Sequence, residues 1–428
     1  MSAFFRVPSW VLPLWLIFSF CSIFSLLMWQ QSTGAGLNIF DTLISLPTLL
    51  ILAPLMIRRG MIGRGFLLPS APLLLYLLFT LVSMAWAIAP DYSKTFRAAG
   101  QVLAIFILFS YLRFSGNTPL LKRALMLACI STAVIGAWHL VVVYGLLQMP
   151  WETTLYDGGR IAEMERYGVK PINSMLATLL VAPQAAMLLG LIIDEDHKGF
   201  RALGLVALAV LLLFLVALER RTGQVSILVA IIACIILYRN RFWYTVFGLA
   251  VIVSATVLIV VPEFILSRGL SWRPAIWLST LDSIAHSPFL GHGITNRVTP
   301  VTVFNDEVGV VEHFRHPHNM ALSIAYFLGI AGLSLWFLIW VPGLLRKLQQ
   351  RAESQREGYI VITLLVGVAA LMFDGGDPLS PFHFDWFCFW VPAMLLLSSQ
   401  AVTGQQLGDG RDISLVARLF PPFKNEQV

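Results

Sequence analysis

Long apolar runs dominate this chain and restrict it to one class of fold. Hydrophobic residues make up 58% of its 428 residues, and charged residues make up only 12%. Runs of about 18 or more apolar residues are typical of membrane-spanning helices. Lipid offers no hydrogen-bond partners, so a span must pair its own backbone groups, and these runs lack the alternation of barrel strands. The sequence therefore predicts an all-α integral membrane protein.

We predict twelve transmembrane helices, nine before a large polar loop and three after it. They lie near residues 10–29, 37–57, 66–88, 98–113, 124–147, 173–193, 202–218, 224–238, 242–262, 318–341, 358–373 and 382–399. The chain then divides into residues 1–262, with a first long loop at 148–172, the large loop at 263–317, residues 318–399 and a tail at 400–428. We expect short interfacial helices within the large loop, because Ile276, Trp277, Leu281 and Ile284 follow helical spacing there.

The distribution of basic residues predicts the orientation of these helices. The loops on one side, with both chain ends, hold 18 of the 29 Lys and Arg residues. The positive-inside rule makes that side cytoplasmic. Both termini are then cytoplasmic, and both long loops lie on the outer side of the membrane. Since the basic residues are spread over many loops, nucleic acid is not an expected partner.

Arginine is enriched on the predicted outer side. Nine of the 11 basic residues there are Arg, and a planar guanidinium binds two oxygens of a phosphate at once. Arg220 and Arg221 lie where one span ends and the next begins, and Arg268 and Arg273 lie in the large loop. Arg220 and Arg221 either anchor the helices at the membrane interface or bind a lipid diphosphate. Trp277, one turn after Arg273, either forms a cation–π pair with it or belongs with it to a substrate-binding site.

Histidines at two turns of the large loop are further candidates. His292 lies between two glycines in the segment PFLGHG, where it is either a loop residue or a substrate contact. His316, His318 and Asn319 precede the tenth predicted span, and histidine is the side chain best suited to accept a proton near pH 7. No cluster of further ligands accompanies His316 and His318, so we expect no metal. Asp374 and Asp377 form either an ordinary turn or, less favoured, a metal-binding acid pair.

In this order, these features resemble the O-antigen ligase and polymerase superfamily. The resemblance rests on the twelve spans, Arg221-Thr222, Arg273 with Trp277, the PFLGHG turn and His318-Asn319, concentrated between about residues 215 and 335. It implies a polysaccharide donor on undecaprenyl diphosphate, a sugar hydroxyl of the lipid A core as acceptor, and a metal-independent inverting glycosyl transfer. No cofactor is implied.

The resemblance also implies roles for individual residues. The family's essential arginines correspond to Arg221 and Arg273 and its essential histidine to His318, with Arg268 as an alternative to Arg273 and Arg220 as a lesser candidate. Glu312 or Glu307 would replace His318 as the base. Trp277, His292, His316 and Asn319 are expected to contact substrate. Three other functions stay open at this point: an O-antigen polymerase, a ligase that glycosylates protein hydroxyls, and a transporter of lipid-linked sugars, although spans nearly free of charge argue against ion-coupled transport.

Overall fold

Helices make up most of the chain in a computed structural model that describes residues 10–29, 33–151, 153–156, 160–260, 273–295, 301–305, 310–314, 316–350 and 357–409. The α-helices are α1 Val11–Trp29, α2 Thr33–Phe40, α3 Ala53–Arg58, α4 Arg64–Ser83, α5 Tyr92–Phe114, α6 Thr118–Leu140, α7 Ile161–Arg166, α8 Ser174–Ile193, α9 Lys198–Ala217, α10 Arg221–Tyr238, α11 Arg241–Val260, α13 Arg273–His286, α14 Met320–Gln349, α16 Gly358–Asp374 and α17 Trp390–Asp409. Shorter turns are η1 Asp41–Ser45, η2 Thr48–Leu52, η3 Val141–Leu146 and η5 Phe384–Phe387.

Nine helical stretches within the described residues are long and apolar enough to cross a membrane. They are Val11–Met28, Gly36–Arg58, Arg64–Ser83, Tyr92–Phe114, Thr118–Leu146, Ser174–Ile193, Lys198–Ala217, Arg221–Tyr238 and Met320–Gln349. The helical membrane fold is thus confirmed, whereas the count of twelve stays a prediction. Each predicted span does contain a helix, but the last one differs: residues 384–387 form η5, and α17 begins only at Trp390.

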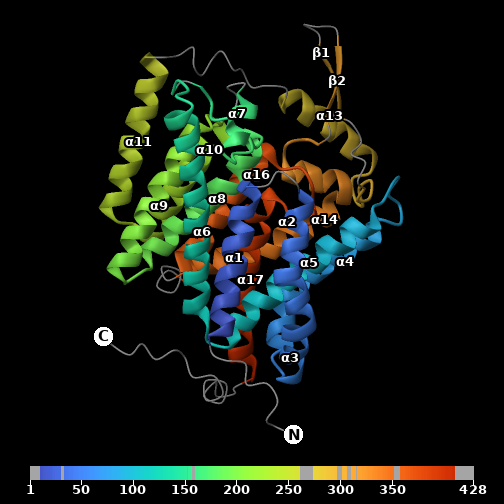
Figure 1. The fold of residues 1–428 in the computed structure, drawn as a ribbon. Helices are drawn as coiled ribbons and strands as arrows, with labels where there is room; N and C mark the ends of the chain where they lie inside the picture. The colour runs from blue at the N-terminus through green and yellow to red at the C-terminus, as the bar shows by residue number, and fades with distance from the viewer. Residues whose placement is uncertain are drawn as a thin grey trace.

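The two long loops predicted to face outward lie at the same end of the helical bundle (Figure 1). Helix α7, from the first loop, and helix α13 with strands β1 and β2, from the second, lie at one end, while α3 lies at the other. Strand β1 spans Val301–Asn305, β2 spans Val310–Phe314, and they pair antiparallel with Val301 opposite Phe314. This small hairpin is an addition to the expected interfacial helices.

Helix α16 lies in the middle of the bundle, packed among α8, α10, α14 and α17. Helices α8 and α16 approach closely because Gly190 of α8 meets the backbone of Tyr359, where a Cβ would lie 2.3 Å from its Cα. Twelve of the 17 residues of α16 are buried, including Asp374 at its end. The position of this carboxylate is therefore fixed by four surrounding helices.

Helix α13 is described from Arg273 to His286 and contains Pro274, and its start at Arg273 stays a prediction. Ile276 and Thr280 are buried one turn apart, so this face packs inward against α14. The predicted capping residue, Ser271, lies outside the described residues.

A break in α14 holds the PFLGHG turn against the bundle. Gly329 has φ 65° and ψ −169°, which interrupts the helix and frees backbone groups on both sides. The turn pairs with them: Ile330 N–H donates to the Pro288 carbonyl at 2.8 Å, and Gly293 N–H donates to the Phe327 carbonyl at 2.8 Å. A Cβ on Gly329 would lie 2.2 Å from the Phe289 oxygen. The PFLGHG turn is thus joined to α14 by backbone hydrogen bonds.

Replacing Gly329 by Ala should therefore destabilise the protein by at least about 2 kcal/mol, since a left-handed backbone and a backbone collision both oppose the added methyl group. Gly248→Ala in α11 is the matched control, because a Cβ there meets nothing within 4 Å and alanine favours helix by up to about 1 kcal/mol. Denaturant-induced unfolding in detergent micelles measures both changes. Equal stability of the two variants would contradict the described break.

Candidate functional site

Asn319 fixes the start of α14 and thereby the position of His318. Its side-chain oxygen accepts a hydrogen bond from Leu322 N–H at 3.0 Å, which caps the helix, and its amide nitrogen donates to the Met372 carbonyl of α16 at 2.9 Å. Capping satisfies backbone donors that a helix start leaves unpaired. Both ends of this side chain are thus engaged within the protein, and α14 and α16 are joined beside the candidate base.

His318 adopts a left-handed backbone conformation, with φ 51°. This conformation costs a residue with a side chain roughly 1–2 kcal/mol. The His318 ring lies 4.1 Å from the ring of His316, measured between centroids. The backbone N–H of His318 donates to His316 Nδ1 at 3.4 Å. Backbone strain of this kind concentrates at functional sites. The strain therefore makes His318 a stronger candidate than its sequence context alone.

Trp277 supports the same turn from α13. Its indole N–H donates to the carbonyl of Pro317 at 3.0 Å, one residue before His318. The sequence suggested a cation–π pair or a substrate contact for Trp277, and the hydrogen bond adds a role in positioning the turn.

Asp374 connects three of the elements that carry candidate residues. Its carboxylate accepts a hydrogen bond from Arg273 Nη2 of α13 at 2.7 Å and another from the Thr222 hydroxyl of α10. The Asp374 side chain is only 3% exposed and that of Arg273 is 30% exposed. A buried carboxylate needs such partners, since an unpaired charge is costly to remove from water. Asp374 thus brings Arg273 beside the residue that follows Arg221.

The sequence analysis assigned Asp374 to a turn or, less favoured, to a metal site, and did not anticipate this ion pair. The sequence did contain a signal for a buried carboxylate, because Asp374 directly follows a long apolar run and therefore ends an apolar helix. Its partners, however, lie 101 and 152 positions away in the chain. Among the described residues no group of three or more His, Cys, Asp or Glu side chains is arranged to hold a metal ion.

The pair Arg220 and Arg221 is oriented by a tight corner between α9 and α10. Glu219 has φ 50°, and its carboxylate accepts a hydrogen bond from the Thr154 hydroxyl at 3.0 Å. Arg220 then caps α10, and its Nε donates to Ser174 Oγ at 2.6 Å. Arg221, half-buried, is the first residue of α10 and directly precedes Thr222. Both arginines therefore lie at the same end of the bundle as Asp374.

Burial keeps both histidines of the turn neutral. Desolvation lowers the pKa of His318 to about 4, with the neighbouring His316 and Arg273 acting in the same direction and Asp374 opposing them. Desolvation likewise lowers the pKa of His316, against the opposing carboxylates of Asp377, Asp374 and Asp385. A neutral imidazole is the form that accepts a proton. The site thus presents His318 in its basic form next to a guanidinium.

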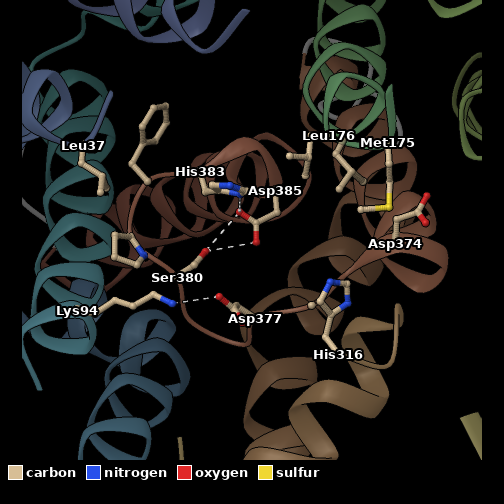
Figure 2. Close-up of a pocket in the computed structure, with 14 residues that line it drawn as sticks. Leu37, Lys94, Met175, Leu176, His316, Asp374, Asp377, Ser380, His383 and Asp385 are labelled. Atoms are coloured by element: carbon tan, nitrogen blue, oxygen red, sulfur yellow. Dashed lines mark hydrogen bonds and ion pairs between the residues drawn. The ribbon is translucent and has the colours of Figure 1, made fainter. Parts of the chain in front are cut away.

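A cavity of about 380 Å³ opens beside this cluster. Figure 2 shows His316 and Asp374 at one side of it, Lys94 at the other, and Asp377 and Asp385 between them. Sequence reasoning did not find the cavity, because Lys94 belongs to α5 and Asp385 to η5, far apart in the chain.

The remaining predicted residues are more distant or lie outside the described part of the chain. His292 contacts backbone and a neighbouring ring: its Nε2 lies 3.0 Å from the Ser283 carbonyl, and its ring lies 4.6 Å from that of Tyr326. These contacts suit a loop residue, and its role in substrate binding stays a prediction. Arg268 and Glu307 lie outside the described residues, so the choice between Arg268 and Arg273 as the family arginine stays open. Glu312 lies on β2, opposite Val303.

Comparison with known proteins addresses this same region. A family model described as O-antigen ligase matches residues 206–337, the stretch from α9 into α14 that includes Arg221, Arg273 and His318. The O-antigen ligase of Pseudomonas aeruginosa is 25% identical to the chain over 395 residues, which cover 90% of each protein. The chain is thus similar to O-antigen ligases, both in this stretch and over most of its length. No solved structure matches it.

This similarity to O-antigen ligases supports an enzymatic role for the chain. The matched stretch ends before α16, so Asp374 and most of the cavity wall lie beyond it. The contacts of Asp374 therefore come from the fold of this chain and not from the family match.

The ion pair between Arg273 and Asp374 should be measurable as a coupling. We expect Arg273→Gln and Asp374→Asn each to lower the free energy of unfolding, because each leaves the other member of the ion pair unpaired in a largely buried place. The loss in the double variant should be smaller than the sum of the two single losses by about 1–2 kcal/mol. Unfolding of the four proteins in detergent gives this coupling. The exposed pair Arg160 and Glu163 is the control and should show no resolvable coupling; equal values for both pairs would contradict the described contact.

Proposed function

We propose that this protein is an O-antigen ligase that transfers polysaccharide from undecaprenyl diphosphate to a sugar hydroxyl of the lipid A core at the periplasmic face. The observation that carries the proposal is the cluster at one end of the bundle, in which Asp374 pairs with Arg273 beside a neutral, strained His318. The similarity to the Pseudomonas aeruginosa O-antigen ligase over 90% of the chain supports the same activity.

In the proposed reaction the arginines act on the leaving group. The bond between the anomeric carbon and the diphosphate breaks, and the diphosphate leaves with its negative charge. Fixed guanidinium groups of Arg273 and Arg221 stabilise that charge, with Arg220 close by, so no metal ion is required. The Asp374 carboxylate holds Arg273 from the opposite side, which keeps its guanidinium in place before substrate arrives.

His318 acts as the general base in this proposal. Its imidazole takes the proton of the acceptor hydroxyl as that oxygen bonds to the anomeric carbon from the face opposite the diphosphate, which inverts the configuration. A base with a pKa near 4 is weak, but the two negative charges of a bound diphosphate would raise the pKa of His318, since opposite charges nearby favour its protonated form. Donor binding would thus make His318 a stronger base when it is needed.

The products of a reconstituted reaction test the function. Purified protein in lipid vesicles would be mixed with an undecaprenyl-diphosphate-linked glycan and rough lipopolysaccharide, with and without EDTA. We expect glycan attached to the core, at a rate that EDTA leaves unchanged. Longer lipid-linked chains would instead indicate a polymerase, glycosylated protein would indicate a protein ligase, and movement of the donor without a new glycosidic bond would indicate a transporter. Loss of transfer in EDTA would instead support a metal site at Asp374 and Asp377.

Substitution of His318 by Gly separates catalysis from folding. Gly relieves the left-handed strain at this position, which offsets the lost ring contact with His316, so the free energy of unfolding should change by less than about 1 kcal/mol. Transfer should nevertheless fall at least about 100-fold, because the proton acceptor is gone. Donor binding and unfolding are measured on the same preparation. A His318→Gly protein that keeps transfer within a few-fold of the wild type would remove His318 as the base.

A further inference from the structure

The cavity beside the catalytic cluster carries a charge opposite to that of the arginines. Three carboxylates line it, those of Asp374, Asp377 and Asp385. Asp374 pairs with Arg273 and Asp377 with Lys94, whereas Asp385 faces His383, so the formal balance of these groups is one negative charge. Burial lowers the pKa of His316, which disfavours a positive charge on this part of the wall. Such a wall repels a diphosphate but offers acceptors to hydroxyl donors.

Buried hydrogen bonds hold the wall of the cavity in place. The Tyr76 hydroxyl of α4 donates to the Pro378 carbonyl at 3.0 Å, the Phe382 N–H donates to Gln101 Oε1 of α5 at 2.7 Å, and the Trp386 indole donates to the Ser380 carbonyl at 2.9 Å. All three hydrogen bonds are buried. The segment between α16 and α17 is therefore organised before a ligand binds, which reduces the entropy lost on binding.

Three polar side chains of the segment between α16 and α17 lie together in the cavity wall. Asp385 Oδ2 accepts from the Ser380 hydroxyl at 3.3 Å, and its Oδ1 lies 3.7 Å from His383 Nδ1 (Figure 2). Apolar side chains, among them Leu176 of α8, also line the cavity. A sugar ring presents hydroxyl groups at its edge and C–H groups on its flat side, so it can contact both the polar and the apolar residues that line the cavity. The volume of about 380 Å³ is in the usual range for small-ligand sites, roughly 300–1,000 Å³.

We infer that this cavity is the acceptor subsite, which binds an uncharged sugar residue of the acceptor through Asp377, His383 and Asp385. The inference rests on the proposed function and assigns the two substrates to opposite sides of the catalytic cluster. His316 lines the cavity and its ring touches that of His318, so a sugar there can present a hydroxyl to the base. The diphosphate of the donor approaches from the side of Arg273. The charges would thus direct the diphosphate of the donor to the arginines and the acceptor sugar to the carboxylates.

The test separates the affinities for the two substrates. Asp385→Asn removes the charge of the carboxylate, and Leu176→Trp fills the cavity from a different helix. Each should raise the KM for rough lipopolysaccharide at least about tenfold, as expected for loss of a hydrogen bond to a charged group, while the KM for the lipid-linked donor changes less than about twofold. Asp282→Asn on the exposed part of α13 is the control and should alter neither constant.

A direct binding measurement distinguishes failure of this inference from failure of the proposed function. The core oligosaccharide released from rough lipopolysaccharide would be titrated into the full-length protein in detergent. We expect binding to the wild type that Asp385→Asn and Leu176→Trp weaken at least about tenfold. If the wild type forms no capped core, the proposed function fails. If it forms capped core but both variants keep the acceptor KM, or raise the donor KM instead, the acceptor subsite is overturned.

Because either variant could disturb folding, each is checked by its unfolding midpoint and by binding of the lipid-linked donor. The two substitutions lie on separate elements, η5 and α8, so misfolding of one leaves the other to decide. A phosphorylated core sugar should bind more weakly than its uncharged counterpart, because the carboxylates repel it. Tighter binding of the phosphorylated sugar would contradict the charge argument.

Discussion

The buried carboxylate of Asp374 is the interaction on which the candidate site depends. It ends a helix packed among four others, and it accepts hydrogen bonds from Arg273 on α13 and from Thr222 on α10. A carboxylate this buried is stable only with partners, so the positions of α13 and α10 are tied to that of α16. Because Arg221 precedes Thr222, the same contact sets where the second candidate arginine begins its helix.

A second constraint acts from the other side of the site. The break at Gly329 opens backbone groups in α14, and the turn after α13 pairs with them. Directly after this turn, the backbone N–H of Ile294 donates to Ser83 Oγ at the end of α4 at 3.1 Å. Helix α13 is thus held at its start by an ion pair and beyond its end by backbone hydrogen bonds. This arrangement keeps Arg273 and Trp277 fixed relative to His318, as electrostatic catalysis requires.

In the proposed function, the guanidinium groups and the cavity carboxylates would favour different substrates. Guanidinium groups at the ends of α10 and α13 favour an anion, whereas carboxylates around the cavity favour hydroxyl donors. Both groups lie at the end of the bundle that carries the long loops (Figure 1). A lipid-linked donor and a lipid-anchored acceptor would both reach that end from within the membrane plane, and the charges would then determine which side each one occupies.

The sequence by itself determined the helical class of the fold, the approximate place of each apolar helix and the resemblance to O-antigen ligases. These follow from local patterns: apolar length, helical spacing and a short order of Arg, Trp and His residues. Only the tertiary structure decided the ion pair of Asp374, the hydrogen bond from Trp277 to Pro317, the engagement of both ends of Asn319 and the cavity with Lys94 and Asp385. Each of these joins residues from helices distant in the chain, and hydrophobic spacing sets which face of a helix is buried but not which helix it meets or which charge it finds there.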